Sequence, residues 1–168
     1  LSRFSAAFGL VSDTAMGTLG GALKRREKIS GRLADALAWL YLGSAILKRY
    51  HDEPQTECTR NLARWGLFHA LNEIEEALLG VIVNLPFRPA AWLLKWLVFP
   101  VGAHLRAADD RLGGLVARSL LEDRDARAML TRDIHVPPAD EPGLGRLEAA
   151  LDKAVAAIVE ELVDWLDA

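Results

Sequence analysis

The sequence predicts an all-α protein: an antiparallel helical bundle with long helices and a short apolar helical insertion. Hydrophobic residues make up 51% of the 168 positions. Most of them are Leu and Ala, which favour helices. β-Branched residues are sparse, which argues against a β-rich fold. Apolar residues also recur every three or four positions in several long segments, which is the period of one helical face. We expect one α-helical module over residues 1–168, since this length suits a single domain.

The first helix is expected over residues 1–26. Its apolar residues at helical spacing are Phe4, Phe8, Val11, Ala15 and Leu19. Gly17 and Gly21 lie one turn apart, so they would let a neighbouring helix approach closely. A basic run follows, made of Lys24, Arg25, Arg26 and Lys28. It has two interpretations: a solvated helix end that suits the helix dipole, or an anion contact for a phosphate or an anionic lipid head group.

Two longer helices are expected next. Ser30 is a good N-cap for a helix that runs to about Tyr50. Its apolar stripe consists of Leu33, Leu37, Leu40, Tyr41, Ser44 and Leu47. Thr56 or Thr59 would cap a third helix that ends at about Val83. The stripe of this helix consists of Ala63, Leu67, Leu71, Ile74, Leu78 and Val81. The polar residues placed largely away from it are Arg64, Asn72, Glu75 and Glu76.

The remaining elements are shorter, apart from the last. A nearly all-apolar helix is expected over residues 90–99, and Pro100 would stop it. Residues 104–133 predict two short helices with a break near Glu122, and a proline-rich connector runs from Val136 to Gly145. The last helix is acidic and is expected over residues 144–166. Its apolar stripe consists of Leu147, Leu151, Val155, Ile158, Leu162 and Trp165.

Residues 77–103 form the strongest physical signal, because only two of these residues are charged. A transmembrane helix needs about 20 uninterrupted apolar residues, and three prolines cut this segment into shorter pieces. Two interpretations remain: a buried core hairpin, or an interfacial segment that lies in a membrane surface with its cations snorkelling to head groups. The residues expected to contact a membrane or a partner are Arg88, Trp92, Leu93, Lys95, Trp96, Leu97 and Phe99.

Charge and cysteine content exclude several classes of protein. The 20 basic and 23 acidic side chains give a net charge of −3, so the basic excess of a general nucleic-acid binder is absent and no nucleic-acid partner is expected. The single cysteine, Cys58, excludes an internal disulfide framework and a metal cage built from cysteines. A helical di-iron site is also disfavoured, because no Glu is followed by His three positions later.

The candidates for catalysis are weak. Residues 17–24 resemble a phosphate loop, but they lack its GKS or GKT ending and a preceding strand. His69 and Glu73 could meet one helical turn apart, although a solvated helix face explains them better. Asp133 and His135 could be a base and its orienting group, but no nucleophile is evident nearby. Asp109 fits the start of a helix better than an acid pair. The sequence therefore predicts no catalytic residue, no cofactor-binding residue and no metal ligand.

Several short segments, taken in order, carry a family resemblance: residues 4–6, 19–25, 33–37, 40–42, 99–102, 110–113 and 144–151. Together they resemble the C-terminal domain of bacterial FadE-type, long-chain acyl-CoA dehydrogenases. The resemblance covers residues 2 to about 155, and no single motif in it is diagnostic. The chain also starts at Leu1 without a Met, and we interpret it as a segment of a larger protein.

The resemblance implies a parent flavoenzyme of fatty-acid β-oxidation. Such an enzyme removes two hydrogens across the Cα–Cβ bond of an acyl-CoA, using a glutamate base and FAD. The resemblance places both upstream of this segment, so the chain itself would be non-catalytic. It also implies partners: the upstream catalytic core of the same polypeptide, a second copy in a homodimer, and peripheral contact with the inner, cytoplasmic face of the bacterial membrane. The alternative is a free-standing α-helical protein-interaction domain without enzymatic activity.

Overall fold

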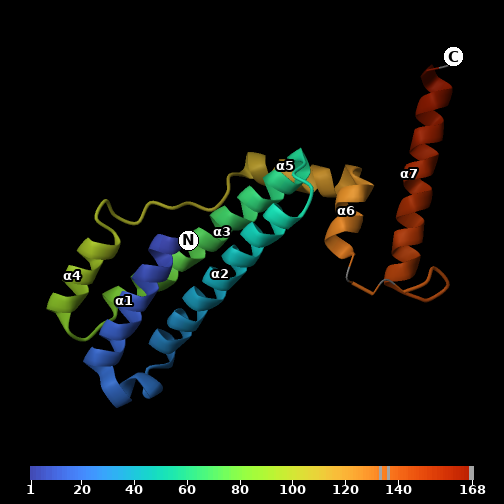
Figure 1. Cartoon of the computed structure of the whole chain (residues 1–168). Coiled ribbons are helices and arrows are strands. Elements are labelled where there is room, and N and C mark those ends of the chain that lie inside the picture. The colour runs from blue at the N-terminus through green and yellow to red at the C-terminus, as the bar shows by residue number, and fades with distance from the viewer. Residues whose placement is uncertain (133, 136, 167–168) are drawn as a thin grey trace. The chain divides into compact units, whose positions relative to one another are not determined.

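The computed structural model describes residues 1–132, 134–135 and 137–166, and this part of the chain contains helices and no strands (Figure 1). The predicted all-α class is confirmed. The chain divides into two compact units, Leu1–Ala126 and Arg127–Ala168. The described helices are α1 (Ser2–Leu19), the 3-10 helix η1 (Gly20–Arg25), α2 (Glu27–Asp52), α3 (Glu57–Val83), α4 (Arg88–Val98), α5 (Asp110–Glu122), α6 (Arg124–Thr131) and α7 (Leu144–Leu166).

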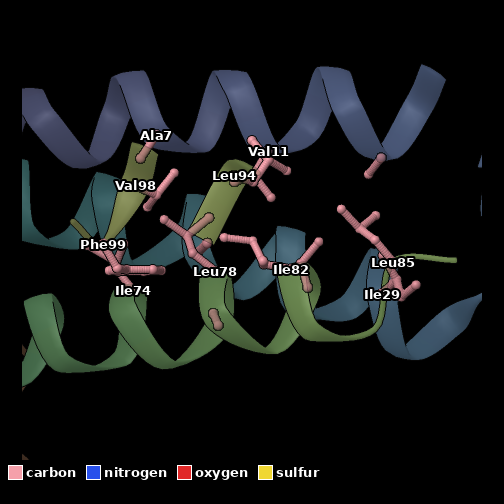
Figure 2. Packing of buried hydrophobic residues seen from close by; sticks show 14 of the residues in the cluster. Ala7, Val11, Ile29, Ile74, Leu78, Ile82, Leu85, Leu94, Val98 and Phe99 are labelled. Atoms are coloured by element: carbon pink, nitrogen blue, oxygen red, sulfur yellow. The ribbon is translucent and has the colours of Figure 1, made fainter. Parts of the chain in front are cut away.

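The first unit is built on the long helices α2 and α3, which a short turn joins into an antiparallel pair (Figure 1). Helices α1 and α4 pack against α3, and side chains from all of these elements meet in one core (Figure 2). Burying a large aliphatic side chain stabilises a fold by about 1.5–3 kcal/mol. The largest side chains that are fully buried here are Ile74, Leu78, Ile82, Leu85, Val11 and Val81.

Helix α1 ends earlier than the sequence predicts. Gly20 has a φ of 51°, a left-handed backbone conformation that glycine adopts without steric cost, and the chain continues as the 3-10 helix η1. The close helix approach expected at Gly17 and Gly21 is wrong, because no heavy atom lies within 4 Å of a Cβ placed at either residue. Close packing occurs instead between α2 and α3, where a Cβ on Gly66 would lie 3.0 Å from Cδ1 of Ile46.

Helix α2 differs from its prediction in both its start and its buried face. It begins at Glu27, so Ser30 is no cap; the Ser30 hydroxyl donates to the backbone carbonyl of Glu27 at 3.2 Å. Leu37 and Tyr41 are exposed, although the stripe placed them in the core. Small residues take part in the contact with α3 because they let the two long helices approach closely. The buried residues of α2 are Ile29, Ala36, Leu40 and Gly43.

Helix α3 follows its prediction more closely. Thr56 is the N-cap, since its hydroxyl accepts a hydrogen bond from the backbone N–H of Thr59 at 3.2 Å. Thr59 is buried, and its hydroxyl donates to the carbonyl of Pro54. The predicted stripe is buried at Ala63, Ile74, Leu78 and Val81 and half-buried at Leu67 and Leu71.

One polar residue of α3 lies deeper than its sequence position indicates. Glu75 is buried, and its Oε1 accepts a hydrogen bond from the backbone N–H of Leu105 at 2.9 Å. This bond attaches the extended segment between α4 and α5 to the bundle. Helix α5 then starts at a cap that the sequence does predict: Oδ1 of Asp109 accepts from the backbone N–H of Leu112 at 2.8 Å.

The second unit contains the end of α6, a proline-rich connector and α7, whose bounds match the prediction. A Cβ on Gly145 would collide with the carbonyl oxygens of Pro137 and Pro138, so the start of α7 requires a glycine there. Leu147 and Trp165, both on the predicted apolar stripe, are exposed. Asp133 and Val136 lie outside the described residues.

Candidate functional site

Helix α4 is the element that the apolar segment 77–103 forms, and its sequence explains its length. It begins at Arg88, two residues earlier than predicted, with Pro89 in the first turn. A proline is tolerated there because the first N–H groups of a helix have no partner within the helix. The helix ends at Val98, just before Phe99 and Pro100.

One face of α4 belongs to the core of the first unit. Leu94 is 4% exposed, and it lies with Val98 and Ala91 against side chains of α1 and α3 (Figure 2). Phe99, which was expected to contact a membrane or partner, is 6% exposed and belongs to the same core, so that expectation is corrected. These residues recur at helical spacing on the side of α4 that faces the bundle, and burial there removes them from the surface.

The opposite face of α4 is apolar and exposed. Trp92 is 73% exposed and Trp96 is 60% exposed, and the two lie one turn apart. Leu93 and Leu97 beside them are about half exposed. One face of α4 is therefore buried, and the other is apolar and exposed. We call Trp92, Leu93, Trp96 and Leu97 the outer face of α4.

Two cations border the outer face of α4. Arg88 and Lys95 lie two turns apart, and together with Trp92 they line a groove of about 320 Å³ against the end of α3. Nη1 of Arg88 donates a hydrogen bond to the backbone carbonyl of Val83 at 3.0 Å. This bond holds the arginine at the edge of the groove. The full lining of this groove is Ile82, Val83, Arg88, Ala91, Trp92 and Lys95.

The basic run forms a second recess, which we call the basic cavity. Its volume is about 450 Å³, and it lies between η1, the start of α2 and the end of α3. Of the predicted anion contacts, Arg25, Arg26 and Lys28 line it, whereas Lys24 is exposed and outside the lining. Four cationic side chains and one carboxylate therefore line this recess. The full lining is Arg25, Arg26, Glu27, Lys28, Ile29, Arg32 and Asn84.

Arg32 also lines the basic cavity, although the sequence did not predict it as an anion contact. The one signal available was its place one helical turn after Lys28. The structure shows why its side chain reaches α3: a Cβ on Gly80 would lie 2.7 Å from Nε of Arg32. Glycine at position 80 therefore gives the guanidinium a path across the end of α3. Beside it, Nδ2 of Asn84 donates to the carbonyl of Gly80 at 2.7 Å.

The groove beside α4 and the basic cavity are lined in part by consecutive residues at the end of α3. Val83 lines the groove and the next residue, Asn84, lines the cavity. Both recesses belong to the first unit, and Figure 1 shows η1 and the connection from α3 to α4 at the same end of the bundle. An exposed aromatic surface and a group of cations are thus placed next to each other.

Two of the polar residues that the sequence analysis considered lie in apolar or aromatic surroundings. His69 packs between two indoles, 4.9 Å from the ring centre of Trp39 and 5.7 Å from that of Trp65, so it lies in an aromatic cluster. Cys58 is buried. Within the residues that the structure describes, no group of His, Cys, Asp and Glu side chains is arranged to hold a metal ion. Across the same residues, no helix is both long and apolar enough to cross a membrane.

Comparison with known families identifies one match. A family model described as "Acyl-CoA dehydrogenase, C-terminal, bacterial type" matches residues 1–164, and it therefore spans both compact units. No solved structure matches the chain. The family match agrees with the resemblance that the short segments of the sequence carry.

Proposed function

This chain belongs to the family of bacterial-type acyl-CoA dehydrogenase C-terminal domains, and from that membership we propose that it is the non-catalytic helical module of such an enzyme. Its role is to hold the catalytic core of the same polypeptide at a membrane surface, close to hydrophobic acyl substrates, and to help the enzyme dimerise. The parent reaction would be the FAD-dependent oxidation of an acyl-CoA in fatty-acid β-oxidation.

The chemistry of that reaction is assigned to the catalytic core and to no residue of this chain. The recesses described above do not suit a flavin. The basic cavity has no aromatic wall to stack the flavin ring, and the polar side chains of the α4 groove are only two cations. We therefore assign neither recess to a flavin, and the proposal places the glutamate base and the FAD site in the upstream core.

The observation that supports membrane contact is the outer face of α4. A helix that lies on a membrane carries a large apolar face bordered by cations, with tryptophans at the level of the head groups. Trp92 and Trp96 provide the aromatic part of this pattern, and Arg88 and Lys95 provide the border. Because Leu94 and Val98 fix the other side of α4 to the core, the outer face is presented by a folded helix.

Dimerisation is assigned to a different surface, the exposed side of α2. Residues 36–47 contain no charged side chain, yet only Ala36, Leu40 and Gly43 of this stretch are buried. Leu37 is 55% exposed and Tyr41 is 74% exposed. This uncharged stretch suits protein better than lipid, and a second copy can cover it by a two-fold, self-complementary contact.

Co-sedimentation with phospholipid vesicles tests the membrane role. We expect the wild-type chain to sediment with the vesicles, and we expect Trp92→Ala/Trp96→Ala to lower the partition coefficient by at least about tenfold, because two indoles no longer enter the interface. Trp165→Ala is the control, since it removes an even more exposed indole from α7. A wild-type chain that ignores vesicles, or a double variant that binds as wild type does, would overturn the proposal.

A further inference from the structure

The charges of the basic cavity are unbalanced within the described part of the chain. Arg25, Arg26, Lys28 and Arg32 surround the recess, and none of the ion pairs between described residues includes them. Glu27 is the single carboxylate in the lining. Like charges that share a recess repel one another, so an anion placed between them would be attracted from several sides.

The backbone adds to this positive potential. Arg26 is the N-cap of α2, and its side chain, which has only donors, cannot cap the N–H groups of the first turn. Cations at the N-terminus of a helix oppose the helix dipole, whereas an anion there is stabilised. Arg26 and Lys28 thus stand where a structural role would favour acidic residues. Glu27 in the first turn favours the helix, whereas Arg26 and Lys28 on either side of it suit a bound anion.

The position of the cavity indicates which anion. Its lining residue Asn84 follows Val83 of the α4 groove in the sequence, and that groove carries the further cations Arg88 and Lys95. The phosphoryl group of a membrane lipid lies beside the interface that tryptophans occupy. A single lipid surface can therefore meet the basic cavity and the outer face of α4 together, which a free phosphate cannot do.

We propose that the basic cavity binds the phosphoryl group of an anionic phospholipid, with Arg25, Arg26, Lys28 and Arg32 as the contacting cations. This inference rests on the proposed membrane role and deepens it: α4 supplies the apolar contact, and the basic cavity makes the protein prefer an anionic surface. Because salt screens such attraction, the preference also weakens as ionic strength rises.

Vesicle binding with and without phosphatidylglycerol in phosphatidylcholine tests this preference. We expect the wild-type chain to bind the anionic vesicles at least about tenfold more tightly, since each basic side chain near an anionic surface contributes to the attraction. Arg26→Glu/Arg32→Glu should abolish the excess and leave binding to pure phosphatidylcholine unchanged. Arg60→Glu/Arg64→Glu makes the same change of net charge at two exposed positions on the other half of α3, and it should keep the excess.

The possible outcomes distinguish a failure of this inference from a failure of the membrane role. Equal binding to both kinds of vesicle, or equal loss in the two double variants, overturns the basic cavity as a lipid site and leaves the role of α4 intact. Absence of binding to either vesicle overturns both proposals. Competition by free inorganic phosphate that removes the anionic preference at constant ionic strength would assign the cavity to a soluble phosphate instead of a lipid.

Gly80→Ala provides a second variant that does not alter charge. The new methyl group would occupy the path of the Arg32 side chain, which must then move. Alanine favours helix more than glycine, so the fold should be retained, as circular dichroism can check. We expect a partial loss of the anionic preference; a variant that keeps all of it would exclude Arg32 in its observed position as a contact.

Discussion

At the scale of single residues, Glu75 fixes the segment that follows α4. Its carboxylate is buried and accepts the backbone N–H of Leu105, a residue 30 positions further along the chain. A hydrogen bond to a charged group contributes more than a neutral one, and it fixes one point of the otherwise extended segment before α5. Helices α4 and α5 are therefore attached separately to α3, with one side chain holding the segment between them.

Glu75→Ala should lower the free energy of unfolding by about 1–3 kcal/mol, since it leaves a partly buried backbone N–H without its partner. Glu75→Gln keeps an acceptor oxygen and should cost less. Urea unfolding followed by circular dichroism measures both. If both variants are as stable as wild type, the hydrogen bond does not attach this segment.

The role of Glu75 could not be predicted from the sequence. The apolar stripe of α3 correctly located Ile74 and Leu78, but it assigned Glu75 to the polar side. Periodicity describes one helix at a time, and the partner of Glu75 is a backbone group on a distant segment. Arg32 could not be predicted as a contact for the same reason, because its side chain passes Gly80, which lies on another helix. The caps Thr56 and Asp109 were predictable because their partners lie three residues away.

At the scale of elements, the two faces of α4 have different surroundings. Leu94 and Leu93 are neighbours in sequence, but Leu94 is buried in the core and Leu93 is on the outer face. The inner face anchors the helix to α1 and α3, and the outer face remains free for another surface. The sequence predicted this helix and a membrane or partner contact at its tryptophans. Periodicity could not assign the other residues to the buried or the exposed face, because nearly every residue of the segment is apolar.

This division predicts opposite results for two adjacent leucines. Leu94→Ala should destabilise the fold by about 2–5 kcal/mol, because it removes buried methyl groups and leaves a cavity. Leu93→Ala should change stability by less than about 0.5 kcal/mol, as surface substitutions do, and it should weaken vesicle binding instead. Chemical denaturation and co-sedimentation measure the two effects. Equal destabilisation by both variants would contradict the assignment of the faces.

At the scale of the whole molecule, we propose different contacts for two exposed apolar surfaces of the first unit. The outer face of α4 is bordered by cations and is assigned to lipid, and the exposed side of α2 is uncharged over residues 36–47 and is assigned to a second copy. The all-α class and the family could be predicted from composition, periodicity and short segments. The exposed surface of α2 could not be predicted in this way. The apolar stripe placed that surface in the core, whereas the helix buries the side that carries Ala36 and Gly43.

The assignment of α2 predicts the oligomeric state. The wild-type chain should sediment as a dimer in analytical ultracentrifugation, and Leu37→Asp/Tyr41→Asp should shift it to monomer, because burying two carboxylates at an apolar contact is unfavourable. The same variant should bind vesicles as a folded monomer. A monomeric wild-type chain, or a double variant that remains dimeric, would contradict this assignment.

The most direct test of the central claim measures whether the indoles of α4 enter the lipid. Vesicles with brominated acyl chains quench tryptophan fluorescence at short range, and the chain contains five tryptophans, of which Trp92 and Trp96 are on the outer face of α4. We predict strong quenching of the wild-type chain and loss of most of that quenching in Trp92→Phe/Trp96→Phe. Quenching that is absent from the wild-type chain, or unchanged in the double variant, would contradict the account.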